Sequence, residues 1–226
     1  MKSRLYWELL DIATYVEDEG GFYSGMIRYS DGRLFALILS NHQDGTSTLP
    51  VCRKYTKKLE TNSFIDGWQN SQAPELVTNH HPILVWVRSL EIGGYKDWHI
   101  PSVMELELLA RYYKCRPATN TNPRRFPKSN KENFNIPPEI RVFGENPYSL
   151  PVGKRYSKNY PECNLHLGDQ FHQNDGFNPS AYISSTVSRI GMMCMWAINF
   201  DRMSLFQVEP YSPCWARAIR RVLIEG

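Results

Sequence analysis

Two histidines and two aspartates lie close together in one stretch of the chain, where they could bind a metal ion: His166, Asp169, His172 and Asp175. The triplets Gly168-Asp169-Gln170 and Asn174-Asp175-Gly176 could instead supply oxygen ligands to calcium. Both lack the dense acidic spacing of a calcium-binding loop, and the chain contains no H-E-x-x-H motif for zinc. Glycine, asparagine and aspartate are also the ordinary residues of turns, so turn formation is the favoured interpretation. We therefore predict no metal and no cofactor.

Two further places in the sequence could suggest catalysis. Ser184-Ser185-Thr186 presents three hydroxyl groups in a row, and Asp97 directly precedes Trp98. In a strand, such hydroxyls usually pair with the backbone, and a carboxylate in a tight corner usually caps backbone N–H groups while the indole fills the core. The chain has no G-x-S-x-G motif and no glycine-rich phosphate-binding loop. We therefore predict that it is not an enzyme.

Length and composition favour one domain. The 226 residues contain no linker-like segment, and a hydrophobic content of 42% can form a sizeable core. The 26 basic and 23 acidic residues are too balanced to predict nucleic acid as a main partner. No apolar run approaches the roughly 18 residues of a membrane span, and Glu8 interrupts the place of a signal peptide's apolar segment. The cysteines are scattered without a C-x-x-C pair, which predicts reduced thiols: Cys52, Cys115, Cys163, Cys194 and Cys214.

The first quarter of the chain is predicted to form an arm followed by strands. Apolar residues near helical spacing suggest an amphipathic stretch over residues 1–18: Leu5, Leu9, Ile12, Ala13 and Val16. We therefore predict an N-terminal arm or helix over residues 1–20 and a single domain over residues 21–226. Strands over residues 22–29 and 34–39 should be joined at Asp31-Gly32 by a two-residue turn. Asp44-Gly45 should lead to another short strand at 48–53.

Two amphipathic helices are predicted in the middle of the chain. Pro82 suits the first position of a helix, and Gly93 supplies a left-handed residue that would end it. Apolar residues recur at the spacing of a buried helical stripe in both segments: Ile83, Trp86, Val87 and Leu90, then Leu106, Leu109, Ala110 and Tyr113.

The corner between these helices is predicted to be the joint of the fold. Asp97 and Trp98 should lock it, and Pro101 forces an extended residue before the second helix. Ser102 and Glu105 then match a capping box, in which each side chain accepts a hydrogen bond from an unpaired N–H at the helix start.

Residues 116–180 contain nine prolines and few periodic apolar positions. We predict a long ordered loop excursion there, of the kind that often carries function. Five of its aromatic residues are candidates to stack on a ligand or to dock a partner, although each could instead pack in the core: Tyr148, Tyr156, Tyr160, Phe171 and Phe177. Strands follow at residues 182–186, 193–200, 204–209 and 215–224.

Several stretches, taken in order, resemble one protein family. The segment GGYKDWHIPSVMEL at 93–106 resembles the signature G-(G/Y)-x-D-W-x-(L/I)-P-(S/T)-x-x-E-L of the Lcl C-terminal-domain-like family. That family is named for a collagen-like bacterial adhesin and is widespread in phage and prophage genes. YISST at 182–186 resembles the family's Y-W-S-S-T, WAINF from Trp196 its W-x-(V/Y)-x-F strand, and ARAIRR around Arg217 its closing strand. Residues 21–25 and 32–38 also resemble phage-type members, whereas Ile183 and Asp201-Arg202-Met203 depart from the family pattern.

The resemblance implies an α+β fold of the C-type-lectin-like kind, in which two helices pack on a twisted antiparallel sheet and long loops bind. It implies a non-enzymatic virion protein of a phage tail, baseplate or fibre, made in the host cytoplasm. Its partners would be other virion subunits and a host-surface glycan or protein receptor, and a homo-oligomer such as a trimer is compatible with this role. The alternative is a bracing protein, attached through residues 1–20, that binds no receptor. A remote alternative is an enzyme of the formylglycine-generating type, which needs a cysteine pair that the sequence does not place.

Overall fold

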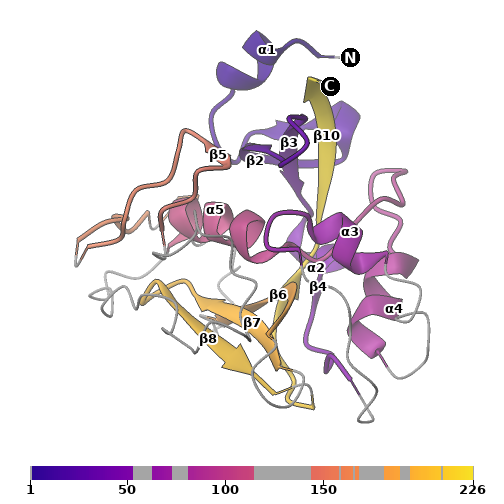
Figure 1. Ribbon diagram of the computed structural model, residues 1–226. Coiled ribbons are helices and arrows are strands. Elements are labelled where there is room, and N and C mark those ends of the chain that lie inside the picture. Colours follow the sequence, from indigo (N-terminus) through magenta and orange to yellow (C-terminus); the bar gives the residue numbers. More distant parts are fainter. Residues whose placement is uncertain are drawn as a thin grey trace.

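The computed structural model describes residues 2–52, 63–72, 81–114, 144–157, 159–164, 166–167, 181–188, 194–209 and 211–225. Within these residues the chain has a mixed α+β fold, in which antiparallel sheets are combined with mostly short helices (Figure 1). The α+β class predicted from the sequence is thus confirmed.

The larger sheet has the strand order β1-β2-β3-β10, and the short strand β5 pairs with β2. Its strands are β1 (Tyr15–Val16), β2 (Gly21–Arg28), β3 (Leu34–Leu39), β5 (Ser149–Leu150) and β10 (Ile219–Glu225). All of these pairs are antiparallel. The apolar run of β3 is buried along its whole length, as expected for a strand with a neighbour on each side.

The second sheet is a three-stranded antiparallel meander, β6-β7-β8. It consists of β6 (Ala181–Ser188), β7 (Cys194–Asn199) and β8 (Ser204–Val208). The first three strands predicted in the tail are therefore confirmed. The predicted fourth strand is two strands in two sheets, because β9 (Ala216–Arg217) pairs with β4 (Thr46–Ser47) and only β10 joins the larger sheet.

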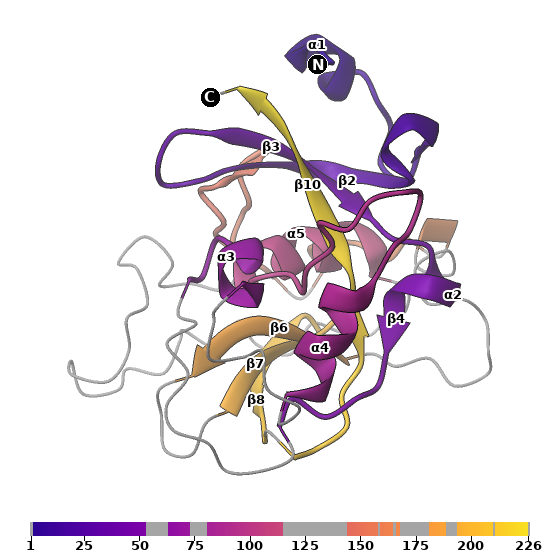
Figure 2. The same cartoon turned by 90° about the vertical axis from the view of Figure 1, so that its right-hand side faces the viewer.

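The helix α5 (Val103–Tyr113) lies between the two sheets and contacts both of them (Figures 1 and 2). Every residue from Val103 to Arg111 is buried, so α5 is not the amphipathic helix that its apolar stripe predicted. Successive residues of an α-helix are about 100° apart, so Glu105 and Glu107 point to different sides of α5. Both carboxylates are fully buried and must find partners inside the protein.

The other helices lie around this centre and are all short. They are α1 (Arg4–Glu8), the 3-10 helix η1 (Glu17–Glu19), α2 (His42–Gly45), α3 (Gly67–Ser71) and α4 (Pro82–Ser89). Pro82 begins α4, as predicted. The capping box of α5 is also confirmed, because Oγ of Ser102 accepts the N–H of Glu105 and Oε2 of Glu105 accepts the N–H of Ser102.

The predicted role of Gly93 needs correction. The helix α4 ends at Ser89, and Gly93 lies beyond it in a tight turn in which Ile92 and Tyr95 exchange two backbone hydrogen bonds of 3.1 Å. Gly93 has a φ of 62° and is therefore left-handed, as its residue type suggested. The left-handed conformation of Gly93 was predicted correctly, but Gly93 forms part of the turn between Ile92 and Tyr95 and does not end α4.

The corner residues Asp97 and Trp98 have different outcomes. Trp98 is buried, with 1% exposure, and its Nε1 donates a hydrogen bond of 3.1 Å to the carbonyl of Tyr95, so its role in the core is confirmed. Asp97 was expected to cap backbone N–H groups. Its carboxylate instead pairs with the guanidinium of Arg220 on β10 at 2.9 Å. This ion pair joins the corner to the larger sheet.

The N-terminal arm packs through a residue that the periodicity did not single out. Trp7 on α1 is fully buried, whereas Leu5 and Leu9 are 62% and 76% exposed. The helix is only one and a half turns long and presents Trp7 to the core, with its ring 5.5 Å from that of Tyr23. The predicted arm thus contains a short helix, but Leu5 and Leu9 are not part of a buried apolar face.

The first hairpin forms where Asp31-Gly32 predicted it, but with a longer turn. Tyr29 and Arg33 pair across the turn, so three residues separate them, and Gly32 takes the left-handed position with a φ of 90°. Farther along, Asp44 and Gly45 belong to α2, and the strand that follows is shifted to Thr46–Ser47.

Two further predictions concern the state of the cysteines and the presence of a membrane span. Cys52, Cys163 and Cys214 are reduced thiols. In the part of the chain that the structure describes, none of the helices is both long enough and apolar enough to cross a membrane.

Candidate functional site

The carboxylate of Glu105 is surrounded by hydrogen-bond donors at the start of α5. Its Oε2 accepts the N–H groups of Ser102 and Gly67 at 2.7 and 3.0 Å, and its Oε1 accepts the Tyr29 hydroxyl at 2.5 Å. Nε2 of His99 lies 3.6 Å from Oε1, an ion-pair distance. Burial alone raises the pKa of Glu105, but His99 and these donors outweigh burial and hold the pKa below its ordinary value of 4.5. Glu105 is therefore a structural anion at the joint.

The carboxylate of Glu107 has its own set of partners. Arg111 donates to it from Nε and Nη2 at 3.1 and 2.7 Å, Asn146 donates from Nδ2 at 2.7 Å, and the Tyr156 hydroxyl completes the set. Burial alone lowers the pKa of the Arg111 guanidinium, but the adjacent Glu107 carboxylate raises it overall. This network fastens α5 to the segment 144–157, which passes beside it. Both buried carboxylates are thus committed to the fold.

Of the five aromatic residues predicted to bind a ligand, the three that the structure describes do not form an exposed surface. Tyr156 is 2% exposed and bonded to Glu107, so its ring packs in the core. Tyr160 lies beside it, with ring centroids 6.0 Å apart, and Tyr148 and Tyr160 are half-buried against the same core cluster. Phe171 and Phe177 lie outside the described residues. Asp169, His172 and Asp175, for which a metal site was considered and turn formation was favoured, also lie outside the described residues. Among the described residues no group of three or more potential ligands can hold a metal.

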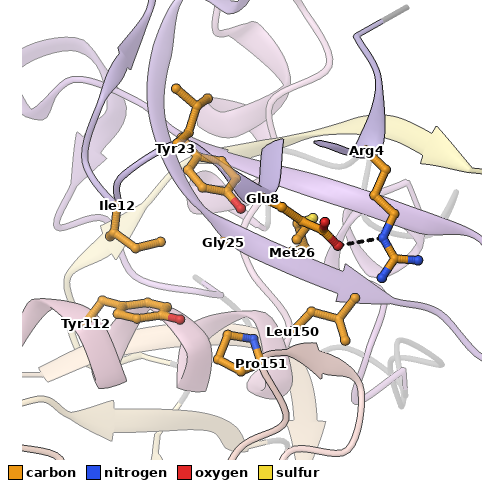
Figure 3. A pocket seen from close by; sticks show the side chains of 10 residues that line it. Arg4, Glu8, Ile12, Tyr23, Gly25, Met26, Tyr112, Leu150 and Pro151 are labelled. Atoms are coloured by element: carbon orange, nitrogen blue, oxygen red, sulfur yellow. Dashed lines mark hydrogen bonds and ion pairs between the residues drawn. The ribbon is translucent and has the colours of Figure 1, made fainter. Parts of the chain in front are cut away.

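A pocket of about 350 Å³ lies between the N-terminal arm, the larger sheet and the end of α5 (Figure 3). We call it the arm pocket. Leu10 and Ile12 contribute to it from the arm, Met26 from β2, and Leu150 and Pro151 from β5 and the residue after it. Its size is at the lower end of the range of about 300–1,000 Å³ that is usual for ligand pockets.

A bulge in β2 shapes one wall of the arm pocket. Tyr23 pairs with Ile38 and Met26 pairs with Ala36, so β2 has one more residue than β3 between the two pairs. In a regular strand, residues 23 and 26 would point to opposite faces. The extra residue, with Gly25 at a φ of 102°, lets both Tyr23 and Met26 line the pocket.

Two tyrosine hydroxyls in the arm pocket are without a hydrogen-bond partner among the described residues. Tyr23 is 3% exposed, and Figure 3 shows its hydroxyl pointing into the pocket. Tyr112, at the end of α5, lies on the opposite wall. Burial, together with Tyr112 and Glu8, raises the pKa of Tyr23, so its hydroxyl stays protonated at neutral pH. The Tyr23 hydroxyl faces the open space of the pocket, where it can donate a hydrogen bond to a ligand.

The charged edge of the arm pocket is formed by Arg4 and Glu8. Nε of Arg4 donates to Oε1 of Glu8 at 2.7 Å, and its Nη1 lies 3.3 Å from Glu225 at the end of β10. Glu225 also pairs with Arg28 at 3.1 Å. These two cations and two anions balance, so the edge of the pocket has no net charge.

Cys214 bears on thiol chemistry. Burial raises the pKa of its thiol to about 11, so the thiol is protonated at neutral pH and is a weak nucleophile.

Comparison of the chain with protein-family models, with curated proteins and with solved structures found no match in any of the three.

The sequence offered only partial signals for the arm pocket. Gly25 within a predicted strand is the usual sign of a bulge, and Arg4 and Glu8 have the i,i+4 spacing of a helical ion pair. No sequence pattern brings residue 112 and residues 150–151 to the arm, because that contact depends on the tertiary fold.

Proposed function

We propose that this chain is a non-enzymatic component of a phage or prophage particle, carried by a tail, baseplate or fibre. It would attach to a glycan or protein receptor on the host surface or dock on another particle subunit, and its fold would be of the C-type-lectin-like kind. The proposal rests on the ordered resemblance to the Lcl C-terminal-domain-like family. One structural observation supports it: the segments that carry the resemblance are bonded to one another around α5.

The joint and the segment 182–186 are connected directly. The N–H of Ser185 donates to the carbonyl of Pro101 at 2.7 Å, and the hydroxyl of Thr186 accepts the N–H of Val103 at 3.1 Å across 83 residues of sequence. The Ser185 hydroxyl accepts a hydrogen bond of 3.2 Å from Nδ2 of Asn70, so this hydroxyl and that of Thr186, which could have suggested a nucleophile, form structural bonds. Ser184 acts in the same way, because its Oγ donates to the carbonyl of Trp196 at 2.8 Å.

The joint is also connected to the closing strand. His99 and Ile219 exchange two backbone hydrogen bonds of 2.7 and 3.0 Å, and Asp97 pairs with Arg220. Arg217, one strand earlier, is fully buried and donates to the carbonyl of Ser40 at 2.8 Å. Motifs that occur in order along a chain support a common fold when they also meet in space, and these motifs do.

A binding screen tests the proposal. The purified chain would be applied to a glycan array and used in pull-downs from host envelope extracts and from particle lysates. We expect one saturable ligand or one particle subunit to be retained. Retention of none of these, together with absence of the chain from purified particles, would contradict the proposal.

A second candidate function is a bracing protein that binds no receptor. The observation in its favour is that four large apolar side chains of the N-terminal arm are exposed: Leu5, Tyr6, Leu9 and Tyr15. Such side chains are individually ordinary on a surface, but here four of them occur within eleven residues. A variant with Leu5→Ser and Leu9→Ser distinguishes the two functions, since both side chains point away from the core. Loss of incorporation with no ligand ever retained favours the brace, whereas retained ligand binding favours attachment.

A further inference from the structure

We infer that the arm pocket binds a small, uncharged, mainly apolar compound that carries a hydrogen-bonding oxygen. This assignment concerns a site away from the loop aromatics, and it holds whether the chain attaches to a receptor or braces a particle. Four features of the pocket support it in turn: the unpartnered hydroxyls, the apolar walls, the balanced edge and the contribution of the arm.

The hydroxyl groups define the polar part of the ligand. Tyr23 is nearly completely buried, yet its hydroxyl has no partner among the described residues, and the hydroxyl of Tyr112 is also without one. The Tyr23 hydroxyl faces the open space of the pocket, so it can exchange a hydrogen bond to solvent for one to a ligand oxygen. The apolar side chains around it strengthen that hydrogen bond relative to one in water. A carbonyl or hydroxyl oxygen meets this requirement.

The walls define the apolar part of the ligand. Leu150 and Pro151 lie on one side of the pocket with Tyr112, and Met26 and Tyr23 lie on the facing side (Figure 3). The apolar side chains on these two facing walls favour a compact ring or a short apolar chain between them.

The charges define a neutral ligand. The Tyr23 hydroxyl stays protonated because burial, Tyr112 and Glu8 disfavour a negative charge there, and the same surroundings disfavour an anionic ligand. The cation Arg4 is already paired with Glu8 and Glu225, so it is not available to neutralise an incoming anion.

The arm completes the pocket. Residues 4–12 form one wall, and α1 is held on the domain by the buried Trp7 and by the ion pair between Arg4 and Glu225. A ligand between the arm and β5 therefore contacts both, and its binding should favour the docked arm.

The test uses three probes of similar shape: benzamide, benzoate and toluene. Benzamide has an uncharged ring with a carbonyl oxygen, benzoate adds a negative charge, and toluene lacks the oxygen. Titrations of the full chain, followed by saturation-transfer NMR, should show benzamide binding at least about 3-fold more tightly than either of the others. Equal binding of all three, or no binding of benzamide, would overturn the proposal.

Two variants locate the binding in the arm pocket. Tyr23→Phe should weaken benzamide binding about 3- to 10-fold and change the melting temperature by less than about 3 °C, because the Tyr23 hydroxyl bonds to no other residue that the structure describes. Tyr15→Phe is the matched control, because Tyr15 is exposed on the neighbouring strand. The Tyr15→Phe protein should bind benzamide as tightly as the wild type does. Leu150→Trp should fill the pocket and abolish binding, whereas Val152→Trp, at an exposed position, should not. Unchanged benzamide affinity in both Tyr23→Phe and Leu150→Trp would contradict this location.

Discussion

At the scale of single residues, two buried carboxylates control the centre of the molecule. Glu105 and Glu107 are two positions apart on α5, and each is satisfied by a different part of the chain. A buried carboxylate is tolerated only when its partners are all in place. The two residues therefore fix the orientation of α5 between the sheets. Apolar contacts alone, which surround the helix on all sides, would define this orientation less sharply.

Replacing Glu107 should be strongly destabilising. Glu107→Ala leaves the Arg111 guanidinium buried without its main partner, so we expect the free energy of unfolding to fall by about 3–5 kcal/mol. Urea denaturation followed by circular dichroism measures this change. Glu8→Ala is the control, because it removes an exposed i,i+4 pair and should cost far less stability than Glu107→Ala. Similar losses in both variants would contradict the assigned role of Glu107.

Glu105 should make stability depend on pH in the acid range. Its pKa in the folded protein is below the ordinary 4.5, so the unfolded chain binds its proton first as the solution is acidified. The stability that Glu105 contributes is therefore present above about pH 4.5 and is lost as the pH falls through the lower folded pKa. The stability difference between the wild type and Glu105→Gln should shrink from about pH 7 to about pH 3. Glu17→Gln, at an exposed position, is the control. A difference that is constant over this range would refute the prediction.

At the scale of elements, the corner before α5 connects three parts of the fold. Trp98 fills the core, Asp97 holds β10 through Arg220, and the residues after Pro101 start α5 and bond to β6. The corner is thus a structural joint, and its aromatic and acidic residues are accounted for without a ligand.

Removing the indole of Trp98 tests the joint. Trp98→Ala should lower the free energy of unfolding by about 3–5 kcal/mol, because it leaves a large cavity in a closely packed region. Trp86 on α4 is only partly buried, so Trp86→Ala should cost clearly less. Equilibrium denaturation of both variants gives the comparison. A Trp98→Ala protein of near-normal stability would show that the corner does not hold the fold.

The arm should depend on one residue. Trp7→Ala removes the buried anchor of α1, so amide hydrogens of residues 4–9 should exchange much faster, while those of β3 should keep their protection. Leu9→Ala, at an exposed position of the same segment, should leave the exchange unchanged. Hydrogen exchange measured by mass spectrometry compares the two variants. Equal protection of the arm in Trp7→Ala and in the wild type would contradict this view.

Local signals were read from the sequence more reliably than distant contacts. The capping box, the start of α4 at Pro82 and the hairpin at Asp31-Gly32 each depend on a few adjacent residues, and each is found in the structure. The short strand β5 was not predicted, because its two residues have no periodic pattern and pair with β2 only through the tertiary fold. The same reason explains Asp97, whose partner Arg220 is 123 residues away.

At the scale of the whole molecule, the two ends of the chain meet on one side. Figures 1 and 2 show α1 near the end of β10, and Arg4 pairs there with Glu225. The closing strand lies beside β3 and contacts the corner through Ile219, so α5 is enclosed by segments from the beginning, middle and end of the chain. The arm pocket is lined by residues between 4 and 26, by Tyr112 and by residues 150–151, which are far apart in the sequence, and this is why the sequence did not reveal it.

The proposed particle function is tested most directly by the composition of the particle. Particles from a culture that encodes this chain would be purified on a density gradient, and each fraction would be analysed by quantitative mass spectrometry and for infectivity or particle count. We predict that the chain follows the particles at a constant ratio to a tail protein. A chain that stays in the soluble fractions, with none in the particle peak, would contradict the proposed function.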